Sequence, residues 1–195
     1  MYVLTIDQRG SRRRADRVPE LLAALAAASG VHPVLTAERT VGDEVQLVVA
    51  DGASVVDVVE TVSRLGGWTV GVSVGPVDAP MPLSTREGRG RAFSAARDAV
   101  DRAKRSPARL AVSGGTDPYA ARRAESSLWL LLAVQDRRTE RGWEVVDTVR
   151  ARGSQAAAAD ALGVSAQAVS QVLHAAGWSE AERGRELSAW LLEEM

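Results

Sequence analysis

Acidic side chains beside two expected strands are the first candidates for chemistry in this 195-residue chain. Asp7 follows the apolar segment 2–6, and Asp43 and Glu44 precede a second apolar segment, 45–49; both segments are typical of strands. If the two strands pair antiparallel, the three carboxylates share one sheet edge. Neighbouring carboxylates repel each other unless a cation lies between them, and Mg²⁺ prefers oxygen ligands and also binds phosphate. The pattern therefore predicts a site for Mg²⁺ and a nucleotide at these three residues.

Arginines are numerous around the same edge. A guanidinium group can bind two phosphate oxygens at once, and Gly88 and Gly90 allow a close approach of the backbone. Arginines that could contact the nucleotide phosphates follow Asp7 and recur in the glycine-containing loop: Arg9, Arg12, Arg13, Arg14, Arg86, Arg89 and Arg91. The alternative is a solvated surface of arginines and turn residues.

Residues 154–178 form the second candidate region, because their types and spacing are typical of a helix-turn-helix. Ala158, Ala159 and Gly163 are small enough for two helices to cross closely. Apolar residues then recur at helical spacing and predict a buried stripe between the helices: Leu162, Val164, Val169 and Val172. The alternative is an ordinary helical hairpin in an all-α domain.

Ser165 is a good N-cap for the second of these helices, which then presents a polar face. Glutamine can bond adenine edges in the major groove of double-stranded DNA, and serine can bond a base or a phosphate. The expected DNA-contacting residues are Ser165, Gln167, Ser170, Gln171 and His174.

The elements that must position these residues predict an α+β protein with two domains. Strands at 2–6, 31–40, 45–49 and 68–74 alternate with helices at 19–28 and 54–65, in the order β-α-β-β-α-β of a ferredoxin-like sheet. That fold places the first and third strands side by side in the middle. A helix at 93–105 and a strand at 109–112 extend the domain.

The turn-forming run at 113–118 separates a domain at 1–116 from an all-α domain at 117–195. In the second domain we expect a long helix at 119–141 that Gly142 ends, then a short helix at 143–149, the helix-turn-helix and a last helix at 180–194. Leu187, Trp190 and Leu191 share one face of the last helix, which favours packing across a homodimer.

Composition limits the class of protein. Apolar residues make up 46% of the chain and charged residues 25%, which is typical of a globular protein. The absence of cysteine excludes disulfides and thiolate metal sites. The chain opens without a signal-peptide pattern and its apolar runs are too short to span a membrane, so we expect a cytoplasmic protein without a membrane partner. A net charge of −1 predicts modest, salt-sensitive DNA binding.

Two motifs carry a resemblance to known families. The run Ile6-Asp7-Gln8-Arg9-Gly10-Ser11-Arg12 and the run Gly42-Asp43-Glu44-Val45-Gln46 resemble the SatD family of bacterial proteins. They are also similar to the palm domain of class III nucleotidyl cyclases and diguanylate cyclases, over roughly the first 110 residues. This resemblance implies that Asp7 and Asp43 hold metal ions and that Arg97 stabilises charge. Arg39 falls where adenylyl cyclases place a base-selecting lysine, so the resemblance adds Arg39 and Arg97 to the residues expected to bind the nucleotide. Ser94 stands about where the cyclases carry an asparagine, which favours ligand binding over turnover.

Two functions of different classes follow from these observations. The first is a DNA-binding transcriptional regulator whose palm-like domain senses a nucleotide with Mg²⁺. The second is a nucleotidyl cyclase or phosphohydrolase with an accessory helix-turn-helix. A palm that serves only as a dimerisation scaffold is a third interpretation.

Overall fold

The computed structural model describes residues 1–78, 80 and 82–195 and shows an α+β protein. The chain divides into two compact units, the first formed by Met1–Trp129 with Glu186–Met195 and the second by Leu130–Arg185. The expected boundary at residues 116 and 117 falls inside the first unit, in a loop between a strand and a helix.

The first unit is built on a mixed sheet of β1 (Tyr2–Gln8), β2 (Pro33–Arg39), β3 (Glu44–Val49), β4 (Trp68–Val74) and β5 (Leu110–Gly114). The strand order is β2-β3-β1-β4-β5. β1 pairs antiparallel with both β3 and β4, whereas β4 and β5 run parallel. The expected antiparallel pairing of the first strand with the third is present, and it sets Asp7 opposite Glu44.

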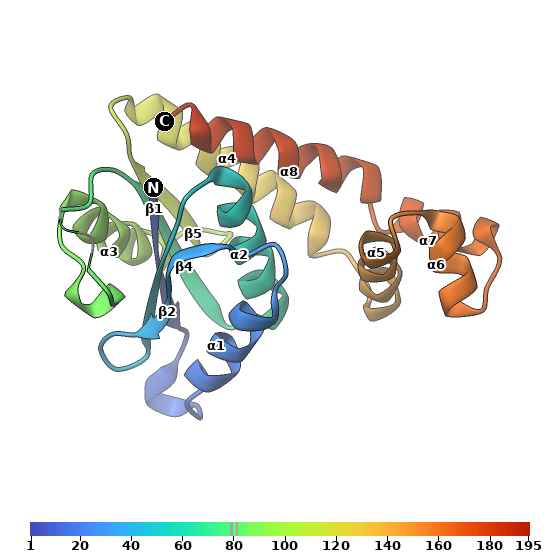
Figure 1. Cartoon of the computed structure of the whole chain (residues 1–195), viewed down its shortest axis with the longest axis horizontal. Coiled ribbons are helices and arrows are strands. Elements are labelled where there is room, and N and C mark those ends of the chain that lie inside the picture. Colours follow the sequence, from blue (N-terminus) through green and yellow to red (C-terminus); the bar gives the residue numbers. More distant parts are fainter. Residues whose placement is uncertain (79, 81) are drawn as a thin grey trace. The chain divides into compact units, whose positions relative to one another are not determined.

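Helices cover both faces of this sheet: α1 (Val18–Ala27) and α2 (Gly52–Leu65) lie on one face and α3 (Arg91–Ala103) on the other (Figure 1). α2 begins where the Asp51 carboxylate accepts a hydrogen bond from the Ser54 N–H at 2.7 Å, and Gly66 ends it. α3 lies directly on β4 because Gly71 has no side chain. A Cβ at Gly71 would stand 2.3 Å from the Val100 backbone nitrogen.

The outer edge of β5 is covered by α4 (Pro118–Gln135). The Trp129 indole N–H donates to the Leu110 carbonyl at 3.0 Å, and the Val112 N–H donates to Glu125 at 2.9 Å. These bonds occupy backbone groups that an uncovered edge strand would leave free.

The second unit contains α5 (Glu140–Arg152), α6 (Gln155–Leu162) and α7 (Ala166–Ala175), together with parts of α4 and α8 (Trp178–Glu193). The expected single helix at 119–141 is wrong, because α4 ends at Gln135 and a new helix starts at Glu140. Thr139 caps that helix: its hydroxyl accepts from the Gly142 N–H at 3.1 Å. Gly142 therefore lies in the first turn of α5 rather than ending a helix.

Small and branched apolar side chains form the core of α5, α6 and α7. The buried members are Val145, Val146, Val149, Ala158, Ala159, Val169, Leu173 and Ala176. Among the residues that the structure describes, no helix combines the length and apolar character that a membrane crossing requires.

Candidate functional site

The turn after β1 shapes the first candidate site. Gly10 has a φ of 71°, a left-handed conformation that glycine adopts without strain, and residues Ser11–Arg13 then form a short 3₁₀ turn. The Gln8 side chain holds the segment that follows: its amide donates to the Ala15 carbonyl at 2.7 Å and its oxygen accepts from the Arg17 N–H at 2.9 Å. One buried glutamine thereby positions the arginines of this loop.

An open hollow of about 550 Å³ lies beside this loop, and we call it the β1-end hollow. Its lining residues come from β1, the turn after it, the β2–β3 turn and the end of α3: Asp7, Gln8, Gly10, Ser11, Arg12, Arg13, Asp43 and Lys104. Cationic and acidic side chains therefore meet in one concave site.

The three expected carboxylates come close together. Asp7 and Asp43 both line the hollow, and Glu44 is the register partner of Asp7. Burial raises the pKa of Asp7, and the charges of Asp43 and Glu44 add to this effect, while Lys104 opposes it. The strand pairing therefore brings Asp43 and Glu44 close enough to Asp7 for their charges to affect its pKa.

Lys104 is the residue of this site that the sequence did not reveal. Its ammonium lies 3.0 Å from the Asp7 carboxylate and 2.9 Å from that of Asp101, one turn earlier on α3. Hydrogen bonding to Asp101, and then to Asp7, raises the pKa of Lys104, so the side chain stays charged. The one available signal was compositional, because Lys104 is the only lysine in the chain.

The donor set around Asp7 fits an ammonium better than Mg²⁺. Lys104 already neutralises Asp7, and Glu44 accepts a hydrogen bond from the Thr40 hydroxyl at 2.5 Å and lies 3.7 Å from Arg97. Across residues 1–78, 80 and 82–195, no group of three or more acidic or histidine side chains is placed to hold a metal ion.

Of the arginines expected to bind the nucleotide, Arg12 and Arg13 line the hollow. Arg39 forms an ion pair with Asp16 at 2.5 Å, and Arg97 faces Glu44. The other five are exposed and do not line the hollow: Arg9, Arg14, Arg86, Arg89 and Arg91.

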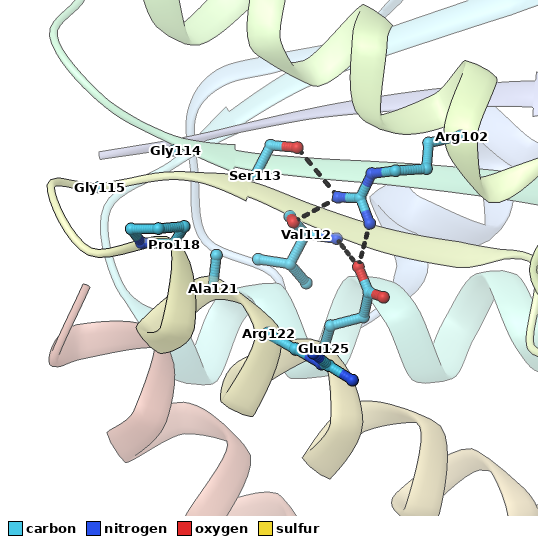
Figure 2. A pocket seen from close by; sticks show the side chains of 9 residues that line it. All are labelled: Arg102, Val112, Ser113, Gly114, Gly115, Pro118, Ala121, Arg122 and Glu125. Atoms are coloured by element: carbon cyan, nitrogen blue, oxygen red, sulfur yellow. Dashed lines mark hydrogen bonds and ion pairs between the residues drawn. The ribbon is translucent and has the colours of Figure 1, made fainter.

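A second hollow, of about 490 Å³, lies between β5 and the start of α4 (Figure 2). The two charged side chains in the middle of this hollow form an ion pair, with the Arg102 guanidinium 2.7 Å from the Glu125 carboxylate. Figure 2 also shows Arg102 bonded to the Val112 carbonyl, at 2.6 Å, and to the Ser113 hydroxyl, at 3.1 Å. Arg102 thus connects the edge of β5 to α4, through Val112 and Ser113 on one side and Glu125 on the other.

The polar face of α7 is the other candidate site, and short local bonds define it. The hydroxyl of Ser154 accepts from the Ala157 N–H at the start of α6, and that of Ser165 accepts from the Ala168 N–H at the start of α7, both at 3.1 Å. Gly163 ends α6 with a φ of 64°. Val169 and Leu173 are buried against α5 and α6, so the opposite side of α7 faces solvent.

All five side chains expected to contact DNA are exposed: Ser165, Gln167, Ser170, Gln171 and His174. Within the described part of the chain, the side chains of Gln167 and Gln171 make no hydrogen bond, so both amides are available to a partner.

Few charges surround this face. Arg150 is bound to Glu182 at 2.7 Å and stacks on Trp178 at 5.6 Å from the ring centre. Arg152, exposed at the end of α5, forms no ion pair with any residue that the structure describes. The surface therefore offers many hydrogen-bonding groups and few phosphate-binding cations.

No protein-family model, curated protein or solved structure matches the chain.

Proposed function

We propose that the protein is a DNA-binding transcriptional regulator in which α6 and α7 form a helix-turn-helix and α7 enters the major groove. The observation that carries the proposal is the division of α7 into two sides. Val169 and Leu173 anchor one side, and Gln167, Ser170 and Gln171 occupy the other. In helix-turn-helix proteins the first residues of the second helix contact base edges, and Gln167 and Gln171 lie in the first turns of α7.

Two features favour base contacts over a purely electrostatic attachment. A glutamine amide can pair with N6 and N7 of adenine, and each good bidentate contact discriminates by about 1–3 kcal/mol. Because Arg150 is bound to Glu182, few cations beside α7 remain for phosphate contacts, so we propose a shallower dependence of affinity on salt than the sequence alone predicts. Sequence preference would then depend mainly on the two glutamines.

For the first unit we propose a ferredoxin-like assignment with a palm-like site. The order β2-β3-β1-β4 with antiparallel neighbours is consistent with this assignment, with β5 as an addition at the edge of β4.

A homodimer is part of the proposal, because two recognition helices about 34 Å apart match one turn of DNA. The face that we assign to the second copy is on α8. Leu187 and Trp190 are 49% and 54% exposed there, three residues apart and so on one side of the helix.

Selection of binding sites from a random DNA library tests the assignment of α7. The double variant Gln167→Ala, Gln171→Ala should lose its base preference at the contacted positions by roughly 10-fold to 100-fold per glutamine, while unspecific binding persists. Gln155→Ala makes the same change at an exposed position of α6 and serves as the matched control. A double variant that selects the same sequence as the wild-type protein would show that α7 is not the reading helix.

A second function is favoured by the β1-end hollow. We infer that it binds a small phosphorylated ligand, such as a nucleotide, whose presence biases DNA binding; such coupling requires that the ligand bind one state of the protein better than another. The alternative is a nucleotidyl cyclase or phosphohydrolase. Incubation with each nucleoside triphosphate and Mg²⁺ or Mn²⁺ separates the two, because a product that Asp43→Asn abolishes would indicate an enzyme.

A further inference from the structure

Lys104 stands where a palm-type metal ion would be expected, against the Asp7 carboxylate. The side chain of Asp7 is 22% exposed, and a carboxylate removed this far from water needs a nearby cation. The ammonium of Lys104 at 3.0 Å supplies that charge from within the chain.

The position of this ammonium is fixed by the fold. Lys104 caps the C-terminal end of α3, where the helix dipole favours a positive charge, and Asp101 contacts it from the preceding turn. α3 itself is held against β4, because its backbone contacts the sheet at Gly71. The ammonium is therefore held in place before any ligand arrives.

The remaining charges of the hollow favour an anion. Three cations line the hollow, Lys104, Arg12 and Arg13, against two carboxylates, Asp7 and Asp43, and Asp101, which also binds Lys104, is not part of the lining. Both arginines are exposed and form no ion pair with any residue that the structure describes. A volume of about 550 Å³ lies within the range of small-molecule sites.

We propose that Lys104 replaces the divalent cation in the β1-end hollow, and that the hollow binds the phosphate group of its ligand without metal, through Lys104, Arg12 and Arg13. This inference rests on the proposal that the hollow binds a phosphorylated ligand. Asp7 is then an ion-pair partner of Lys104, which Asp101 holds in place as well, and it is not a metal ligand.

The experiment is calorimetric titration of the full chain with pyrophosphate and with ATP, each in EDTA and in Mg²⁺. Binding is expected in EDTA, and Mg²⁺ should leave it equal or weaker because the metal neutralises phosphate charge. Lys104→Met and the double variant Arg12→Ala, Arg13→Ala should each weaken binding at least about tenfold, since each removes charge-assisted hydrogen bonds. Arg105→Ala, an exposed neighbour outside the hollow, should bind as the wild-type chain does.

Asp7→Asn gives the opposite result under the two interpretations. A metal site loses its ligand and binds nothing, whereas a lysine site keeps its cation and loses a repulsive charge, so binding in EDTA should be retained or tightened. This variant also protects the test against misfolding of Lys104→Met.

The possible failures are distinct. Binding of either probe only with Mg²⁺, or its loss in Asp7→Asn, would overturn the metal-free site while leaving the hollow as a ligand site. Binding of neither probe in either condition would overturn the ligand proposal as well.

Discussion

Gly71→Ala tests the contact that places α3, and with it Lys104, over the sheet. A Cβ at this position would lie 2.3 Å from the Val100 nitrogen and 2.4 Å from the Ala96 carbonyl oxygen. Both obstacles are backbone atoms, so no side-chain rotation relieves them. To reach the 3.4 Å at which ordinary contact begins, α3 must retreat from β4 by about 1 Å.

The expected cost follows from packing. Forcing one extra carbon into a close-packed interface destabilises proteins by about 1–3 kcal/mol, and a backbone obstacle places Gly71→Ala at the upper end of that range. Amide hydrogen exchange of β1 and β4 measures this as a lower free energy of opening. The 3.0 Å contact between Lys104 and Asp7 should also lengthen, because Lys104 moves with α3.

Gly75→Ala is the matched control, since it adds the same methyl group just beyond the end of β4. There the new Cβ meets the Ala92 Cβ at 3.6 Å, an ordinary contact, and the backbone conformation suits alanine. Equal protection of the sheet amides in Gly71→Ala and Gly75→Ala would refute the claim that backbone contact at Gly71 sets the position of α3.

Two further predictions concern α8. Burial, with the charges of Glu193 and Asp51, raises the pKa of Tyr2 to about 12, so the buried phenol contributes stability that is present below pH 10 and lost as pH rises towards 12, up to about 3 kcal/mol. Urea unfolding at increasing pH should show this loss in the wild-type chain and not in Tyr2→Phe, and parallel profiles would contradict it. Sedimentation should show a dimer that the double variant Leu187→Glu, Trp190→Glu converts to a monomer, whereas Leu83→Glu, at a 97% exposed position, stays dimeric; a monomeric wild-type chain would exclude this interface.

The helices around the polar face of α7 could be predicted from sequence because their determinants are local. Ser165 lies three residues from the N–H that it caps, and Gly163 ends α6 through its own backbone conformation. The same kind of signal was misread at Thr139. Glycine often ends a helix, which made Gly142 look like a terminator. Threonine is also a good N-cap, and here the Thr139 hydroxyl accepts from the Gly142 N–H and begins a new helix.

The carboxylate cluster was predictable for a different reason. Antiparallel pairing of β1 with β3 fixes which ends meet, so the vicinity of Asp7 and Glu44 follows from strand order alone. The partners of the arginines do not follow in this way. Arg39 pairs with Asp16, 23 positions earlier, and that choice depends on how the loop after β1 folds back under the control of Gln8.

The contact of Lys104 with Asp7 could not be predicted from the sequence, and it changes which ligand the carboxylates are expected to bind. Nothing within ten residues of Lys104 indicates Asp7, which lies almost a hundred positions away and meets it only because α3 crosses the sheet at Gly71 and ends beside β1. If Lys104 is left out of account, the three carboxylates predict a metal ion, because a cation must relieve the repulsion between them. In the fold, the ammonium of Lys104 lies beside Asp7 and is such a cation. The same three carboxylates therefore support opposite predictions for Asp7→Asn, and the choice between them depends on one long-range contact.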